Sequence, residues 1–236
     1  MRKGDKTWTR LLLATALLLA LCPAARARKG KHPTDLTEVL AQMSLVSKRL
    51  KTVSANLDYT TVTVLVDDKS TQSGQVYFRK GKTPEICVKF QSPDRKILLL
   101  KNHTGDIYLP KSNQIQEYDV GQNSQMVQQF LLLGFGTETV ELKKTYNIKY
   151  LQEVDLGGET TAQLELTPRK SSLAAQISKI QLWISEDSWL PVQQKFFEAG
   201  GNYLIAHYTG VKVNWNLPNS DFELNAPSDA KLVKMN

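Results

Sequence analysis

Period-two alternation of apolar and polar residues is the feature that most constrains how this chain can fold. It is clear in residues 74–80, where Val76 and Phe78 fall on one predicted face and more polar residues fall on the other. Turn residues follow the alternating runs at short intervals, as in residues 67–70 and 81–84. This spacing predicts an antiparallel meander rather than the alternating strand–helix units of a nucleotide-binding parallel sheet.

The predicted strands are numerous enough to form one large sheet. They are residues 59–66, 74–80, 86–90, 97–100, 107–109, 114–120, 146–154, 160–167, 177–185, 192–198 and 203–215. A sheet of ten or more strands curls. We therefore expect a mainly β (α+β) fold that is a curled, unclosed antiparallel half-barrel, with residues 221–227 as an ordered-to-frayed tail.

Two segments depart from the alternation and are predicted to be helices. The first begins at a capping box, in which Thr34 or Asp35 caps the helix and Glu38 completes the box. Its apolar residues recur at helical spacing and are Leu36, Val39, Leu40, Met43, Val46, Leu50 and Val53. The second, residues 124–136, is the most apolar stretch after the N-terminus and ends at Gly136. We expect both to cover one concave face, with the second as a helical lid over an apolar cavity.

The N-terminus has the three parts of a secretory signal peptide. A basic start precedes the apolar residues 11–21, and Ala25 and Ala27 have the spacing that signal peptidase recognises. The apolar run is too short to span a bilayer as a permanent helix. We expect cleavage near Ala27, which leaves 28–236 as a single domain. Lipidation of Cys22 is the less favoured alternative, because Leu21 precedes it.

Charge and cysteine content argue against some classes of function and against a disulfide-stabilised fold. The formal charge of +7 includes a strongly basic signal peptide, and residues 28–236 carry 25 basic and 22 acidic residues. Such a mild and dispersed excess does not predict nucleic-acid binding. After cleavage Cys87 is the one cysteine, so no intramolecular disulfide can form, and we interpret it as a small core residue.

The sequence contains no catalytic constellation that would define an enzyme. His32, His103 and His207 lack metal-ligand spacing, and Gly-x-Ser-x-Gly is absent. We expect no metal, no cofactor and no enzymatic activity. An exported hydrolase is the least favoured alternative.

The predicted strands and lid carry many apolar residues, while the sequence offers few polar residues that could form a reactive site. This excess of apolar surface predicts a cavity for lipid. Each buried CH₂ of an acyl chain contributes about 0.8 kcal/mol, so such a cavity needs no polar anchor. The predicted cavity and lid residues are Val62, Val64, Val76, Phe78, Phe90, Met126, Val127, Phe130, Leu131, Leu133, Phe135 and Trp183.

The order of several motifs resembles the LolA-type periplasmic lipoprotein carriers, the outer-membrane lipoprotein-sorting family. The resemblance covers nearly all of the chain after the signal peptide. It is carried by residues 36–43, 74–80, 88–93, 97–110, Tyr118, 126–135, 180–184, 190–194 and 222–227.

The resemblance implies an unclosed barrel with a helical lid that holds the acyl chains of a lipoprotein. It also implies that a basic residue at the end of the glycine-led strand ties the lid shut. That latch position corresponds to Lys80, with Arg79 beside it. The family commonly has arginine followed by proline there, whereas this chain has Lys80-Gly81, and lysine is a poorer fork donor.

The function implied is that of a soluble periplasmic carrier, or chaperone, acting as a monomer. Its partners would be acylated lipoproteins or other lipids, an inner-membrane lipoprotein exporter and an outer-membrane acceptor. The alternative is an envelope-stress sensor, or another lipid-binding module of the same fold, that acts through a membrane partner.

Overall fold

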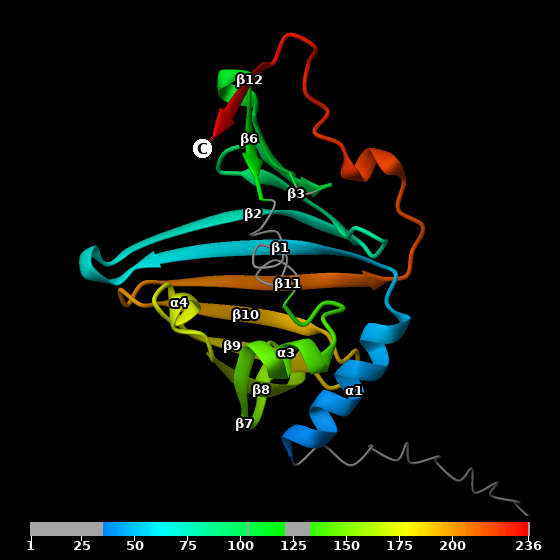
Figure 1. Cartoon of the computed structure of the whole chain (residues 1–236), viewed down its shortest axis with the longest axis vertical. Helices are drawn as coiled ribbons and strands as arrows, with labels where there is room; N and C mark the ends of the chain where they lie inside the picture. Colours follow the sequence, from blue (N-terminus) through cyan, green and yellow to red (C-terminus); the bar gives the residue numbers. More distant parts are fainter. Residues whose placement is uncertain (1–34, 103, 121–132, 236) are drawn as a thin grey trace, which may run out of the picture. The chain divides into compact units, whose positions relative to one another are not determined.

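One open β-sheet organises the chain in the computed structural model, which describes residues 35–102, 104–120 and 133–235 (Figure 1). These residues belong to one compact unit. The predicted signal peptide, residues 1–27, lies outside them. The strands are β1 (Thr52–Thr63), β2 (Asp68–Arg79), β3 (Glu85–Ser92), β4 (Lys96–Lys101), β5 (Thr104–Leu109), β6 (Gln114–Asp119), β7 (Tyr146–Leu156), β8 (Glu159–Pro168), β9 (Ile177–Ser185), β10 (Pro191–Glu198), β11 (Tyr203–Val213) and β12 (Lys231–Met235).

The strand order leaves the sheet unclosed. It runs β12-β6-β5-β4-β3-β2-β1-β11-β10-β9-β8-β7, and the end strands β12 and β7 do not pair with each other. The predicted open, mainly β half-barrel is therefore confirmed. One pair differs from the prediction, because β12 lies parallel to β6, with Lys231 opposite Gln114. The predicted tail thus leads into an ordered edge strand.

The first helix, α1 (Leu36–Arg49), begins as predicted and ends earlier. The side chain of Asp35 accepts a hydrogen bond from the backbone N–H of Glu38 at 2.9 Å, which caps the first turn. Leu50 is extended, and Val53 already belongs to β1. The helical prediction was wrong for Val53 because that residue fits both the helical spacing and the alternation of Val53, Ala55 and Leu57.

Both strands of the β1–β2 hairpin begin earlier in the sequence than predicted, β1 at Thr52 rather than Tyr59 and β2 at Asp68 rather than Gly74. The predicted strand 59–66 was wrong at its end, because Val64–Val66 forms the short 3-10 helix η1. Asp67 closes this turn in the left-handed region, at φ 49°, and its N–H donates to the Val64 carbonyl at 3.3 Å. Strand β2 then starts at Asp68 rather than at Gly74. The predicted turn at residues 67–70 is therefore wrong beyond Asp67.

The described part of the predicted lid is not helical. Residues 133–136 form turns, with Gly134 at φ 86° and Gly136 at φ 71°. Residues 124–132 of the predicted helix lie outside the described residues. Two short helices were not predicted, α3 (Thr139–Thr145) and α4 (Ser171–Ala174).

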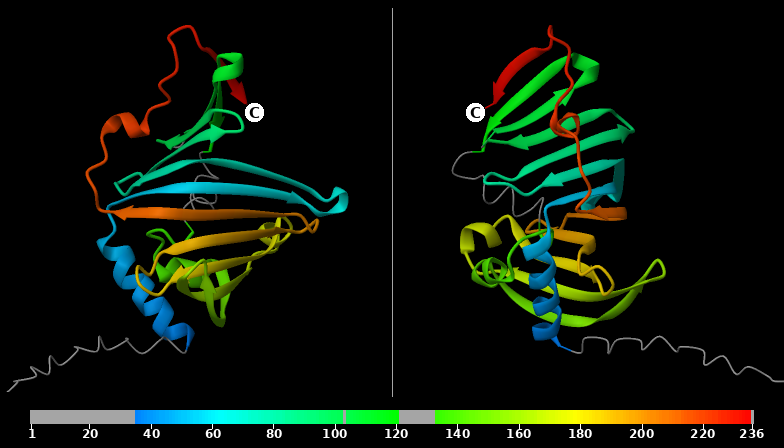
Figure 2. Two further views of the ribbon diagram at one scale, coloured as in Figure 1. Left: turned by 180° about the vertical axis from the view of Figure 1, so that it is seen from behind. Right: turned by 90° about the vertical axis from the view of Figure 1, so that its right-hand side faces the viewer.

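Helices α1, α3 and α4 lie over one face of the sheet, here called the inner face (Figure 2). Apolar side chains form two clusters on this face. The first cluster joins α1, α3 and α4 to β8 and β9, and includes Met43, Leu142 and Leu173. The second joins β1–β4 and β11, and includes Leu50 and Phe78. Burying one apolar stripe of each helix against the sheet is what holds these layers together.

A third cluster lies on the opposite, outer face. There Phe222 of the short helix η3 (Asn219–Phe222) packs against Cys87 and Leu99. The C-terminal segment, coloured orange to red in Figure 2, crosses this face between β11 and β12. Cys87 is fully buried and free, as predicted for a core residue, and burial raises the pKa of its thiol to about 11.

Gly74 allows β2 and β3 to approach closely. The register between these strands shifts between Ser73 and Gly74. A Cβ atom at Gly74 would overlap the carbonyl oxygen of Lys89 and lie 2.7 Å from the Cα of Phe90, both of which are backbone atoms that cannot turn away. A side chain at this position would therefore push two central strands apart.

We expect Gly74→Ala to lower the free energy of unfolding by about 1–3 kcal/mol, as overpacking does in a well-packed core. Urea unfolding followed by circular dichroism measures this change. Gly200→Ala is the control, because nothing lies within 4 Å of a Cβ there. Equal stability of the two variants would contradict the close approach assigned to Gly74.

Candidate functional site

An apolar cavity of about 380 Å³ lies on the inner face of the sheet. Its volume is near the lower end of the range for ligand pockets. It is formed by strands β1–β5 on one side, by β10 and β11 on the other, and by the start of β9. The lining residues are Leu57, Tyr59, Val76, Val88, Phe90, Lys96, Leu98, Ile107, Gln176, Ile177, Gln194, Phe196, Leu204, Ala206 and Tyr208.

Side-chain alternation places these residues in the cavity. In β1 and β3 every second residue faces inward, which brings Leu57 and Tyr59 together with Val88 and Phe90. The rings of Tyr59 and Phe90 meet edge to face, with their centroids 6.3 Å apart. The cavity is therefore built from the same pattern that forms the sheet.

A short chain of hydrogen bonds fixes one side of the cavity. The Tyr208 hydroxyl donates to Gln194 Oε1 at 3.1 Å, and Gln194 Nε2 donates to the carbonyl of Leu133. Phe135 packs edge to face on Tyr208, with ring centroids 4.8 Å apart. Burial is the main reason that the pKa of Tyr208 is raised. Gln194 thus anchors the turn at residues 133–136 to the sheet.

The structure brings several predicted site residues to this region. Val76 and Phe90 line the cavity, and Phe78 is buried in the adjoining cluster on the same face. Leu133 and Phe135 are buried in the inner-face clusters. Their predicted contact with lipid remains a prediction.

Three predicted cavity residues lie elsewhere. Alternation along β1 and β9 places Val62 and Trp183 on the outer face, because Tyr59 and Leu182 face inward. Val64 lies in η1 and its side chain is exposed. Placing these three in the cavity was wrong because apolar character alone does not determine which face of a strand a residue occupies. Met126, Val127, Phe130 and Leu131 lie outside the described residues.

Lys80 contacts α1 rather than any described part of the predicted lid. Its Nζ donates to the carbonyl of Ser47 at 3.2 Å, and its backbone N–H donates to the carbonyl of Lys51 at 2.7 Å. These bonds hold the end of α1 against β2. A latch to the lid stays a prediction, because most of that segment lies outside the described residues.

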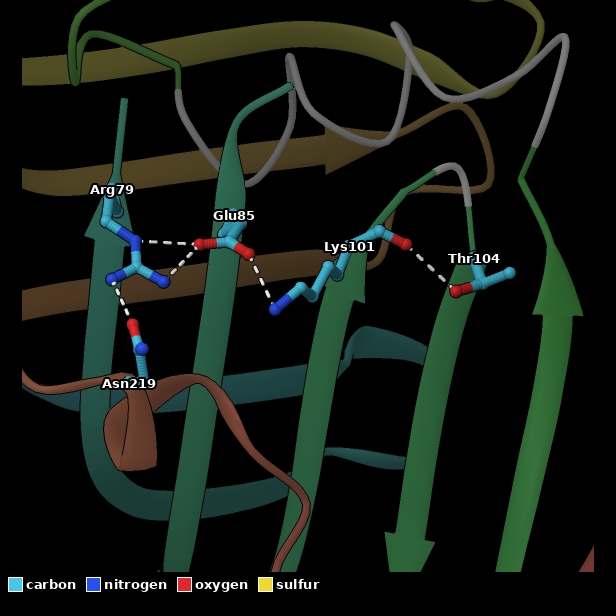
Figure 3. A network of polar contacts seen from close by, with 5 residues as sticks. All are labelled: Arg79, Glu85, Lys101, Thr104 and Asn219. Atoms are coloured by element: carbon cyan, nitrogen blue, oxygen red, sulfur yellow. Dashed lines mark hydrogen bonds and ion pairs between the residues drawn. The ribbon is translucent and has the colours of Figure 1, made fainter. Parts of the chain in front are cut away.

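Arg79 is placed differently from the prediction, in a polar network on the outer face (Figure 3). Its Nε donates to Glu85 Oε2 at 2.7 Å, and its Nη1 donates to Asn219 Oδ1 at 2.9 Å. The guanidinium carbon lies 4.3 Å from the ring centroid of Phe222. Arg79 therefore ties the C-terminal segment to the sheet, and its assignment to the lid latch is wrong.

Several lining residues were missed by the sequence reasoning. Leu57 lay before the predicted start of the strand, and Leu204 was not selected from a strand that was predicted. Alternation, applied strictly from Val53 onward, would have found Leu57. Lys96 carried no such signal, because a lysine in an apolar lining contradicts the hydropathy pattern.

The described residues contain no helix long and apolar enough to cross a bilayer. Within the same residues, no group of three or more His, Cys, Asp or Glu side chains is arranged to hold a metal ion.

The open sheet and the helices that cover one face of it match the unclosed half-barrel that the resemblance implied for the fold. Residues 85–222, more than half of the 236 residues, match the model of a family described as "Uncharacterized protein", and the chain belongs to this family. No curated protein matches the sequence significantly.

Solved structures give a likeness in fold at low sequence identity. An uncharacterized conserved protein from Thermus thermophilus is 14% identical, with a TM-score of 0.54, over 84% of this chain and 98% of that one. MucB is 13% identical, with a TM-score of 0.52, over 84% of this chain. This chain spans 64% of the MucB chain.

A third match bears the name of the predicted family. It is a putative outer membrane lipoprotein-sorting protein domain from Vibrio parahaemolyticus, 12% identical, over 80% of this chain and 96% of that one. Its TM-score is 0.44, so this match adds nothing to what the sheet and the two structures above establish.

Glu85 is the centre of the network in Figure 3 and yields a prediction about stability. Burial acts to raise its pKa, but hydrogen bonds from Lys101 and Arg79 outweigh burial and leave the pKa lowered. The Lys101 Nζ lies 2.8 Å from Glu85 Oε1, and the Glu85 side chain is 16% exposed. The ionised carboxylate therefore stabilises the native state.

We expect Glu85→Gln to lower the free energy of unfolding at neutral pH by about 1.5–3 kcal/mol, the value of hydrogen bonds to a charged group. Because the native pKa is below the unfolded one, this contribution is complete above the unfolded pKa. It is lost as the pH falls through the native pKa. Urea unfolding at neutral and acidic pH should show the difference from wild type shrinking on acidification.

Glu223→Gln serves as the control, since Glu223 is exposed, and it should have little effect at either pH. A Glu85→Gln deficit that persisted or grew at acidic pH would show that the ionised carboxylate is not the stabilising species.

Proposed function

We propose that this protein is a non-enzymatic lipid carrier that binds the acyl chains of lipoproteins in the cavity on its inner face. In this proposal the protein is exported, loses residues 1–27 and works in the periplasm as a soluble monomer. It receives lipoproteins from an inner-membrane exporter and passes them to an outer-membrane acceptor. The observation that supports it most directly is the apolar cavity of about 380 Å³.

The cavity offers the right chemistry for an acyl chain. Side chains such as Val76, Leu98 and Ile107 present hydrocarbon from three strands of the same half of the sheet. Burial of each CH₂ contributes about 0.8 kcal/mol, so a chain of several carbons binds without a directional contact. Gln194 and Tyr208 are already hydrogen-bonded, to Leu133 and to each other, and therefore do not demand a polar ligand.

Loading requires the cavity to be covered and uncovered, which we assign to the segment before Leu133. Phe130 and its apolar neighbours in residues 126–135 would lie over the bound chain. The turn at residues 133–136 supplies the fixed end, since Gln194 and Tyr208 hold it on the sheet. Phe130→Glu should then weaken acyl binding while the sheet stays folded.

A charge placed in the cavity tests the carrier proposal. We expect Leu98→Glu to reduce the affinity for a fluorescent long-chain acyl probe at least tenfold, because the carboxylate would be desolvated against the lining residues. Leu65→Glu is the matched control, because Leu65 is 94% exposed in η1. Probe fluorescence titrations measure affinity, and circular dichroism confirms that both variants are folded.

Native mass spectrometry of protein purified from the periplasm completes the test. Absence of any bound lipid or lipoprotein, together with no uptake of the probe by the wild type, would contradict the carrier proposal. Equal affinities of wild type and a folded Leu98→Glu variant for the probe would show that this cavity is not the acyl-binding site.

A second candidate function is that of a partner-binding sensor module of the same fold. The observation that favours it is the exposed apolar end of the β1–β2 hairpin, where Val64, Leu65 and Val66 are 54%, 94% and 68% exposed. Three adjacent exposed apolar side chains are typical of a binding surface.

The two leucine variants distinguish the candidates. A sensor predicts that a stable inner-membrane partner co-purifies with the wild type, is lost with Leu65→Glu and is retained with Leu98→Glu. A carrier predicts the reverse dependence for bound lipid. If both variants still co-purified with the membrane partner, the sensor candidate would be contradicted.

A further inference from the structure

Among the described residues that line the cavity, Lys96 is the one cation. It begins β4, and alternation puts it on the same face as Leu98. It is half-buried and lies opposite Phe90 of β3 in the register. An ammonium group in an apolar lining is costly unless something compensates for its lost hydration.

Within the described residues, the compensation comes from an aromatic ring and not from a carboxylate. The Nζ of Lys96 lies 4.7 Å from the ring centroid of Phe90, and Phe90 in turn contacts the ring of Tyr59. Of the acidic groups nearest in sequence, Asp94 pairs with Lys111 and Glu85 pairs with Lys101. The third, Asp106, lies opposite Leu99 on the outer face. A cation–π contact replaces only part of a hydration shell.

Burial lowers the pKa of Lys96, and no charged neighbour contributes to that shift. The direction of the shift agrees with the geometry, since both indicate a positive charge that has no anionic partner among the described residues. An anion brought to this position would form a charge-assisted hydrogen bond in a partly desolvated setting, where such bonds are stronger than at the surface.

We propose that the cavity selects amphiphiles with an anionic head, carboxylate or phosphate, and that the Lys96 ammonium binds this head. The hydrocarbon then lies against Leu98, Val88 and Ile107. This inference rests on the proposed function, because it requires the cavity to bind acyl chains. It goes further by naming the head-group chemistry and the residue that recognises it.

Lys195 provides a matched comparison on the other face of the sheet. Its Nζ lies 3.8 Å from the ring centroid of Tyr203, and burial is the main cause that lowers its pKa too. It does not line the cavity. A lysine that serves only to cover aromatic surface should behave like Lys195, and a head-group ligand should not.

The experiment compares three long-chain probes with the same hydrocarbon: palmitate, hexadecyl phosphate and the neutral methyl palmitate. Lys96→Met should weaken binding of palmitate and hexadecyl phosphate about tenfold, which corresponds to about 1.4 kcal/mol, and leave methyl palmitate unchanged. Lys96→Arg should restore the anionic probes. Lys195→Met should alter none of the three affinities, which isothermal titration calorimetry measures.

Each contrary result has a distinct meaning. If the wild type binds no probe, the carrier proposal and this inference both fail. If it binds all three probes equally and Lys96→Met changes nothing, the carrier proposal stands and head-group recognition is overturned. Lys96-dependent binding of inorganic phosphate alone would assign the site to a free anion, which also overturns the inference.

Discussion

Side-chain alternation in the central strands is the constraint on which the rest of this structure depends. Strand β3 shows it most clearly, because Val88 and Phe90 line the inner cavity while Cys87 packs against Phe222 on the outer face. A slip of one residue would exchange these faces completely. Burial on both sides therefore fixes the register of β3. It also fixes Gly74 beside the backbone of Phe90, where a side chain has no room.

The inner face combines tight packing with a space that side chains leave unfilled. Helices α1, α3 and α4 complete the core over β8 and β9, and the second cluster fills the region of β1–β4 and β11. The cavity draws its lining from residues near both clusters, such as Phe196 and Phe90. A ligand that enters it binds the native state alone, so occupancy and stability are thermodynamically linked. The proposed carrier function and the stability of the fold would then depend on the same residues.

Local patterns in the sequence predicted most of the strands and the inward direction of Val76, Phe78 and Phe90. These local patterns failed where the same residue is compatible with two different structures or with either face of a strand. Val64 has strand propensity, yet the left-handed Asp67 closes a turn that includes it. Trp183 lies in a strand as predicted, but hydrophobicity does not reveal its face. The pairing of β12 with β6 and the contact of Arg79 with Asn219 join residues far apart in sequence, which no local pattern encodes.

An open sheet also has two edges, each with backbone groups able to pair with another chain. The described structure meets this hazard in two ways. Strand β7 carries a bulge at Leu151 and exposed charges at Glu153 and Asp155, which interrupt any template for a further strand. Strand β12 is short and charged, with Lys231 and Lys234. The openness of the sheet, on which the proposed loading of the cavity depends, thus makes protection against edge-to-edge aggregation a requirement of this fold.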